Sequence, residues 1–127
     1  MLNGFLIIDK PQGISSNQVL GRLKKLLPRN LKMGYLGTLD PEATGVLAVA
    51  LGEATKVIEY IAEGVKTYEF AVRFGMESDT LDLAGEITTY DEDYPSVTEI
   101  TQVLPEFLGK SMQIPPDFSA RKVNGVR

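Results

Sequence analysis

Two short apolar runs constrain the fold of this chain more than any other feature: GFLIID at residues 4–9 and VLAVAL at 46–51. Each has six residues and is followed by turn-forming residues, which is typical of a buried strand. Between the runs, valine and leucine recur at helical spacing until Pro28, and Ser15 and Ser16 are good helix caps. A strand, a helix and a second strand are therefore expected in this order.

The second half of the chain has one strong pattern and several weaker ones. TYEFAVRF (67–74) alternates apolar and polar residues and gives the clearest strand signal in the chain. A helix is expected over 54–62 and a weaker strand over 86–90. A further helix should follow the S-V-T-E capping box at 96–99, with Pro105 kinking or restarting it.

Composition limits the chemistry that this chain can perform. Its 127 residues fit one domain, with 43% hydrophobic and 24% charged residues. No apolar stretch is long enough to span a membrane, and the start lacks a signal-peptide pattern, so the cytoplasm is expected. Cysteine and histidine are both absent, which excludes disulfides and removes the usual ligands of zinc, haem and iron–sulfur clusters. Catalysis would have to use carboxylates, lysine, arginine, tyrosine, serine or threonine.

Charge is distributed unevenly along the chain. The net charge of −4 argues mildly against a nucleic-acid partner, but residues 22–32 hold five basic residues and no acid. Residues 77–99 hold eight acids and no base. A local basic face can bind phosphates even on an acidic chain. The alternative is an ordinary solvated helix face.

The stretch YLGTLDPEATG places one aspartate, Asp40, between leucine and proline in a region (29–45) that reads as a long loop. Asp40-Pro41 fits a helix start, with aspartate as the cap and proline at the first helical position. Against that interpretation, long loops are commonly functional, and glycines on both sides let the backbone approach a ligand closely. Both interpretations remain open on spacing alone.

Other catalytic arrangements find little support. A phosphate-binding GxxxxGK[ST] loop is absent, and a Ser-His-Asp triad is impossible without histidine. A two-carboxylate glycosidase site could pair Asp40 with Glu42 or Glu53. That signal is weak, because any chain with 17 acidic residues offers such pairs.

Four blocks in order resemble the TruB family, the bacterial tRNA pseudouridine synthases. LKMGYLGTLDPEATGVLAVALGEATK (31–56) resembles the family signature, and GFLIIDKPQGISS (4–16) resembles its opening segment. KTYEFAVRFG (66–75) with DTLDLAGEI (79–87) is similar to its tyrosine strand and acidic loop. QIPPDFSARKVNGVR (113–127) is similar to a later QxPPxxSAxKxxG segment. The likeness covers nearly the whole chain.

This resemblance implies an α+β pseudouridine synthase fold, with a mixed, largely antiparallel sheet flanked by helices. Residues 1–127 would be the N-terminal part of a catalytic domain, truncated at its C-terminal side. The rest of that domain and any C-terminal RNA-binding domain would be absent. The hairpin signal Asn124-Gly125 agrees, because only Val126 and Arg127 follow it. The alternative is a frayed tail in which the pair has no meaning.

The resemblance also implies a reaction and a nucleophile. A uridine in the T-loop of tRNA (position 55) would be isomerised to pseudouridine, without cofactor or metal, and Asp40 would be the nucleophile. Whether its carboxylate attacks the sugar or the base stays open. The cation that keeps it ionised would be an arginine beyond the last residue of this chain.

Four further residues are assigned to substrate binding by the resemblance. Tyr68 would pack on the target base, whereas the alternative is an ordinary core aromatic. Tyr35 stands where the family usually has histidine, in the loop that helps to extrude the uridine. Lys10 and Lys56 would be loop anchors or phosphate contacts. Glu42 stands where the family commonly has leucine, so the details of RNA contact are expected to differ from those of the family more than the chemistry does.

The expected partner is tRNA, recognised through the folded shape of its T-loop, and a monomer is expected. The basic residues of 22–32 would contact RNA phosphates. Two alternatives remain: a non-catalytic RNA-binding fragment, and a guide-RNA-dependent relative that modifies ribosomal RNA.

Overall fold

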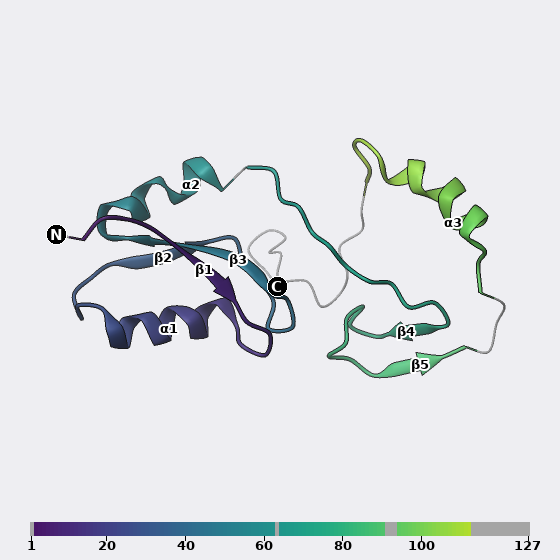
Figure 1. The fold of residues 1–127 in the computed structure, drawn as a ribbon, viewed down its shortest axis with the longest axis horizontal. Coiled ribbons are helices and arrows are strands. Elements are labelled where there is room, and N and C mark those ends of the chain that lie inside the picture. The colour runs from purple at the N-terminus through teal and green to yellow at the C-terminus, as the bar shows by residue number, and fades with distance from the viewer. Residues whose placement is uncertain (1, 63, 91–93, 113–127) are drawn as a thin grey trace. The chain divides into compact units, whose positions relative to one another are not determined.

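A computed structural model of the chain describes residues 2–62, 64–90 and 94–112 (Figure 1). These residues form two compact units, an N-terminal unit (Met1–Tyr68) and a C-terminal unit (Glu69–Arg127). Each unit has its own small sheet, and every strand pair that the structure describes is antiparallel. The expected α+β class with largely antiparallel pairing is therefore confirmed.

The N-terminal unit is built on a three-stranded sheet. Strands β1 (Gly4–Lys10) and β2 (Met33–Leu36) both pair with the central strand β3 (Gly45–Leu51), which gives the order β1-β3-β2. Lys10 at the end of β1 lies opposite Gly45 at the start of β3. The chain therefore leaves β1 and enters β3 at the same end of the sheet, and the segments on either side of these two residues can meet there.

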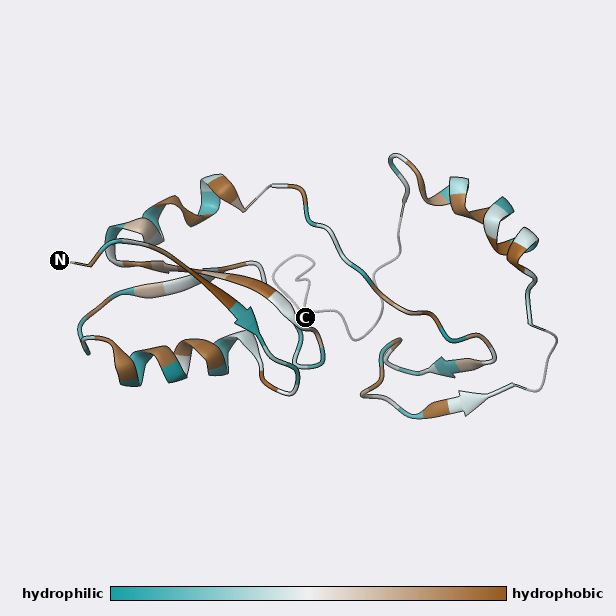
Figure 2. Ribbon diagram, in the orientation of Figure 1, coloured by the Kyte–Doolittle hydropathy of each residue, from teal (hydrophilic) through white to brown (hydrophobic). Residues whose placement is uncertain are grey.

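Helix α1 (Ser16–Leu26) covers one face of this sheet. Its N-terminus is closed by a capping box, in which Ser15 accepts from the Gln18 amide and the Gln18 side chain accepts from the Ser15 amide. Bands of hydrophobic and hydrophilic residues alternate along the helix (Figure 2). Its buried apolar residues pack with those of β3, and the resulting core cluster consists of Val19, Leu20, Leu47, Val49 and Leu51. Burial of each such side chain contributes about 1.5–3 kcal/mol.

The helix expected over 54–62 begins as a 3-10 helix, η1 (Gly52–Val57), and continues as the single α-helical turn α2 (Ile58–Ile61). A Cβ placed on Gly34 of β2 would lie 3.0 Å from Ile58 Cδ1. The glycine therefore serves close packing of α2 on the sheet.

The C-terminal unit begins with a hairpin of β4 (Met76–Ser78) and β5 (Ile87–Thr89). The weak strand signal at 86–90 is thus confirmed. The connection between the strands is held by its own carboxylates, because Asp79 accepts from the Glu86 amide at 2.8 Å. The same connection brings Gly85 so close to neighbouring side-chain oxygens that a Cβ on it would lie 2.1 Å from Asp79 Oδ1.

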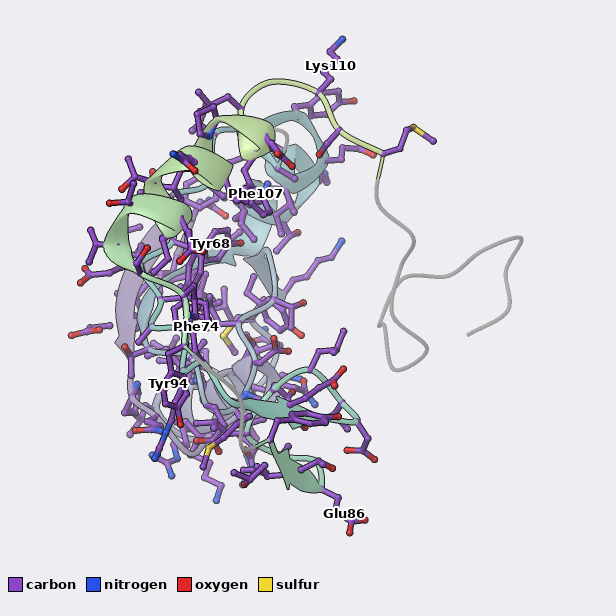
Figure 3. The ribbon with its side chains drawn as sticks, turned by 90° about the vertical axis from the view of Figure 1, so that its right-hand side faces the viewer. Tyr68, Phe74, Glu86, Tyr94, Phe107 and Lys110 are labelled. Carbon is purple, nitrogen blue, oxygen red and sulfur yellow. The ribbon has the colours of Figure 1, made fainter. Side chains whose placement is uncertain are left out.

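Helix α3 (Val97–Val103) follows, with the expected capping box between Ser96 and Glu99. Pro105 restarts the chain as a 3-10 helix, η2 (Leu104–Phe107), which confirms the expected break. The side chains of this unit are largely exposed, and Figure 3 labels Phe74, Tyr94 and Phe107 among them.

Two sequence predictions are wrong within the described residues. The run 67–74 forms no strand, because no described strand pairs with it, and a strand exists only when a neighbour satisfies its backbone groups. The region 29–45 is not all loop, since β2 lies inside it. The hairpin expected around 124–125 and the QxPPxxSAxKxxG-like block at 113–127 lie outside the described residues.

Candidate functional site

Asp40 lies in the connection between β2 and β3, at the first position of a tight turn. The Ala43 amide donates to the Asp40 carbonyl at 3.1 Å, with Pro41 at the second position. Aspartate followed by proline is favoured at these two positions of a β-turn. The chain then enters β3 without forming a helix, so the helix-cap interpretation of Asp40 is wrong. The Asp40 residue is exposed.

The residue before Asp40 is fixed by a serine from α1. Ser16 Oγ donates to the Leu39 carbonyl at 2.9 Å and accepts from the Leu39 amide at 2.9 Å. Ser16 is only 1% exposed. Both backbone groups of Leu39 are therefore bound by one buried hydroxyl.

The residue after Asp40 is fixed from the end of β1. The Pro41 carbonyl accepts from the Gly13 amide at 2.8 Å and from Lys10 Nζ at 3.2 Å. The same ammonium group donates to the carbonyls of Ile14 at 2.7 Å and Pro11 at 3.0 Å. Lys10 thus joins the β1–α1 connection to the turn that carries Asp40.

Lys10 is 0% exposed, and its ammonium group is bonded to three carbonyls. It has no free surface to offer to an RNA phosphate in this arrangement. Of the two roles expected for Lys10, the geometry is that of the loop anchor.

A third contact joins the same two segments at the surface. Gln12 Nε2 donates to Glu42 Oε2 at 2.8 Å. Glu42, two residues after Asp40, is thereby directed to the β1–α1 connection. Both side chains are exposed, so this contact adds little stability compared with the buried anchors.

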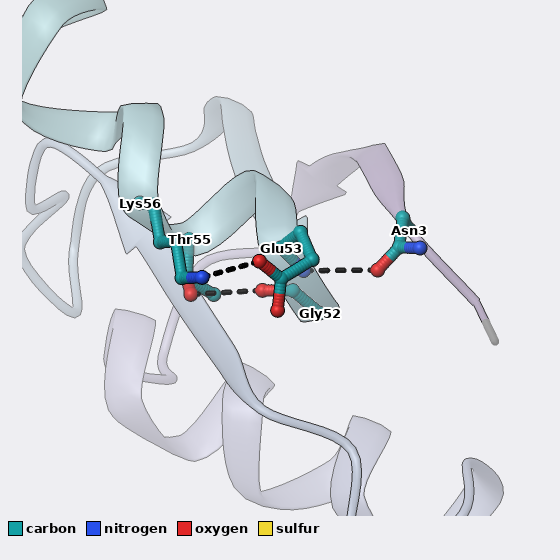
Figure 4. Close-up of polar contacts among 5 residues, drawn as sticks. All are labelled: Asn3, Gly52, Glu53, Thr55 and Lys56. Atoms are coloured by element: carbon teal, nitrogen blue, oxygen red, sulfur yellow. Dashed lines mark hydrogen bonds and ion pairs between the residues drawn. The ribbon is translucent and has the colours of Figure 1, made fainter.

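Glu53 and Lys56 lie at the opposite end of β3. They form an ion pair, and Asn3 Oδ1 accepts from the Glu53 amide at 2.9 Å (Figure 4). The hydrogen bond and charge of Lys56 lower the pKa of the Glu53 carboxyl. Seven strand residues separate this end from the Asp40 end, a length of about 20 Å. A glycosidase pair of Asp40 and Glu53 is therefore wrong, because such carboxylates lie within about 10 Å of each other.

The structure does not bring Lys56 to the Asp40 turn, and neither tyrosine lies in the connection that carries this turn. Tyr35 lies on β2 opposite Val49 and packs, partly buried, against the core cluster. Tyr68 is 64% exposed and lies outside any strand. Their contacts with a base, and a phosphate contact by Lys56, stay predictions.

Sequence reasoning missed Ser16 and Gly13 as neighbours of Asp40. Two adjacent serines at a helix start were the available signal: Ser15 fills the capping position, which leaves the Ser16 hydroxyl free for another partner. The partner itself, 23 residues away, could not be read from local pattern.

Within the described parts of the chain, no group of three or more aspartates, glutamates, histidines or cysteines could hold a metal ion. In the same parts, no helix has the length and apolar character needed to cross a membrane.

Comparison with known proteins identifies the family. The model of the TruB family pseudouridylate synthases, N-terminal domain, matches residues 24–127. This chain belongs to the TruB family. Its α+β fold is accordingly that of the N-terminal part of a pseudouridine synthase, as the four sequence blocks predict.

Individual TruB relatives extend the likeness over nearly the whole chain. The tRNA pseudouridine synthase B of Dinoroseobacter shibae is 48% identical over 126 residues, which are 99% of this chain and 41% of that protein. The enzyme of the same name from Rickettsia akari is 46% identical over 127 residues, 100% of this chain and 43% of the relative. The enzyme of this name from Anaplasma marginale is 48% identical over 124 residues, which are 98% of this chain and 40% of the relative. The chain spans about two fifths of the length of these relatives.

Proposed function

We propose that the protein to which this chain belongs converts a uridine of tRNA to pseudouridine, that the uridine lies in the T-loop, and that Asp40 is the nucleophile. The relatives named tRNA pseudouridine synthase B support the reaction and the substrate. The observation that carries the role of Asp40 is its exposure in a turn anchored on both sides by buried groups. A reactive carboxylate must be reachable and held in place.

The proposed reaction is an isomerisation and needs no redox partner. The N1–C1′ bond of the uridine breaks, a C5–C1′ bond forms, C5 loses its proton and N1 regains one. An ionised carboxylate can add covalently during this exchange or stabilise positive charge on the sugar. Asp40 can meet a nucleoside only after the base leaves the RNA stack, because the T-loop base is otherwise enclosed.

Asp40→Asn in the protein at its full natural length tests the nucleophile. The amide keeps the shape of the side chain but removes the charge, so tritium release from 5-tritiated tRNA should fall more than about a thousandfold. Glu42→Gln is the matched control, since it removes a neighbouring charge while its amide oxygen can still accept from Gln12. Turnover of Asp40→Asn near the wild-type rate would eliminate Asp40 as nucleophile.

The proposed RNA surface is the basic segment 22–32. Its cationic side chains are all exposed; they are Arg22, Lys24, Lys25, Arg29 and Lys32. Contacts with phosphates should make tRNA affinity fall steeply with salt. Each lost contact should reduce the steepness of the plot of log K against log salt by about one. A variant with both Lys24→Ala and Lys25→Ala should therefore reduce the magnitude of this slope by up to about two.

The alternative function, an RNA-binding fragment without activity, is favoured for the 127 residues alone because they span about two fifths of their relatives. This chain by itself should bind tRNA without releasing tritium. Turnover by the 127 residues alone would contradict this expectation. Activity of the full-length protein on bare tRNA transcript would exclude the guide-RNA-dependent alternative.

Tyr68 is proposed to pack on the everted base, in line with its exposed ring. Tyr68→Phe keeps the ring and Tyr68→Leu removes it, so the leucine variant should lose more turnover if stacking matters. Equal losses in both variants would instead assign the role to the hydroxyl group.

A further inference from the structure

The buried hydroxyl of Ser16 has no task within its own helix. Ser15 already caps α1 by accepting from the Gln18 amide, and the Gln18 side chain accepts from the Ser15 amide in return. Ser16, one residue later, is 1% exposed and directs its oxygen to Leu39 in another segment. Two adjacent serines therefore serve different purposes.

We infer that Ser16 is a positioning residue for Asp40, an inference that rests on the proposed role of Asp40 as nucleophile. Its hydroxyl binds the amide and the carbonyl of Leu39, both at 2.9 Å. Pro41, on the other side, is bound by Lys10 and Gly13. The backbone is thus fixed immediately before and after Asp40, and only the dihedrals of Asp40 itself lie between the two anchored residues.

A hydroxyl is suited to this arrangement because it donates one hydrogen bond and accepts others from a single atom. Alanine at position 16 would leave an amide and a carbonyl of Leu39 without their partner. Threonine would keep both bonds and add one methyl group. The two substitutions therefore separate the loss of the hydrogen bonds from a change in packing.

The direction of the effect follows from where the anchor acts. Ser16 lies behind the turn and is buried, so it has no surface with which to bind tRNA. Loosening Leu39 should displace the Asp40 carboxylate from the reacting atom while leaving the RNA-binding face unchanged. A misplacement on the order of 1 Å can lower turnover by about a hundredfold. The loss should thus appear in kcat and not in KM.

The experiment compares Ser16→Ala, Ser16→Thr and Ser15→Ala in the protein at its full natural length. Ser15→Ala is the matched control, because it removes a side-chain hydrogen bond from the adjacent residue without touching Leu39. Thermal unfolding of each variant shows how much stability each has lost, and tritium release is measured below all unfolding transitions. Ser16→Ala should lower kcat about ten- to a hundredfold with KM within about threefold. Ser15→Ala should leave kcat within about threefold of wild type.

Ser16→Thr should restore most of the turnover lost in Ser16→Ala, even where its extra methyl group lowers the unfolding temperature. Amide hydrogen exchange at Leu39 gives a readout independent of activity, and it should accelerate in Ser16→Ala but not in Ser15→Ala. Equal kcat values for the two alanine variants, or a change in KM alone, would overturn the inference. If Asp40→Asn is inactive while Ser16→Ala turns over like Ser15→Ala, only the positioning role fails. If Asp40→Asn is active, the proposed role of Asp40 as nucleophile fails first.

Discussion

The two units of this chain differ in how much of their apolar surface they bury. Every buried apolar side chain among the described residues lies in the N-terminal unit, where α1 packs on the sheet. Most of the apolar residues described in the C-terminal unit are exposed, and Leu83, Phe107 and Leu108 are each more than three quarters exposed. The first unit therefore has a core of its own, whereas the described residues of the second unit bury little apolar surface that could stabilise it.

This difference explains where a reactive group can be held in place. The Asp40 turn is carried by the unit with the core, and its anchors, Lys10 and Ser16, are both buried there. Loops that carry out chemistry are commonly displayed on a rigid scaffold. The acidic hairpin connection of the other unit is held by short-range hydrogen bonds, such as the Ala84 amide donating to Asp82 at 2.8 Å and the Thr80 amide donating to Ser78 of β4 at 3.3 Å.

The largest expected effect compares the same substitution in the two units. Leu47→Ala removes a side chain that is 1% exposed, so it should lower the free energy of unfolding by about 2–5 kcal/mol. Leu83→Ala, at a position 78% exposed, should change it by less than about 0.5 kcal/mol. Urea denaturation monitored by circular dichroism measures both. Similar losses would mean that the two units are equally packed, contrary to the comparison.

Substitution of two lysines, one buried and one exposed, should give the next largest difference in the free energy of unfolding. Lys10→Met removes the ammonium donor from the carbonyls of Pro11, Ile14 and Pro41, of which the last keeps the Gly13 amide, and a loss of about 2–3 kcal/mol is expected. Lys56→Met removes only an exposed ion pair with Glu53 and should cost less than about 1 kcal/mol. The same denaturation experiment applies. A mild effect of Lys10→Met would show that water can replace the ammonium group at the Asp40 turn.

Local sequence patterns predicted the N-terminal unit well because its elements are strongly periodic. The apolar runs became β1 and β3, and the amphipathic pattern between them became α1. The four residues of β2 could not be foreseen, since MGYL has no pattern of its own and becomes a strand by pairing with β3. The run 67–74 failed for the converse reason: it has the pattern but no described partner strand.

The candidate site was predictable only in part. The sequence blocks single out Asp40 in the segment that precedes β3, although its role stays a prediction. The contacts that hold the turn could not be read from local pattern, because Ser16 and Leu39 are 23 residues apart and Lys10 and Pro41 are 31 apart. Such contacts depend on the pairing of β1 with β3, which brings both connections to one end of the sheet.

Substitution of two glycines, one in each unit, should have effects of intermediate size. A Cβ added to Gly21 of α1 would meet no other atom within 4 Å, so Gly21→Ala should stabilise the N-terminal unit by about 0.5–1 kcal/mol. A Cβ on Gly85 would lie 2.1 Å from Asp79 Oδ1 and 2.3 Å from Thr80 Oγ1. Gly85→Ala should therefore open the hairpin connection, which amide exchange at Glu86 would detect. An unchanged exchange rate would mean that the connection yields easily.

The smallest expected effect separates two capping boxes of the same form. Helix α1 uses Gln18 and helix α3 uses Glu99 at the third helical position, and only the latter can titrate. The Ser96 hydroxyl and then its amide lower the pKa of the Glu99 carboxyl below its ordinary value of 4.5. A carboxyl with a lowered pKa stabilises the folded form above its unfolded pKa, and this contribution disappears as the pH falls through the folded value.

The N-terminus of α3 should therefore loosen below about pH 4.5, whereas the cap of α1 should not respond. Amide exchange at Glu99 and Gln18 between about pH 3 and 6, corrected for intrinsic rates, measures the two helices in one sample. Glu99→Gln should abolish the pH dependence at α3, because it converts this box into the kind found in α1. Persistence of the pH dependence in that variant would place its origin in another carboxyl group of the C-terminal unit.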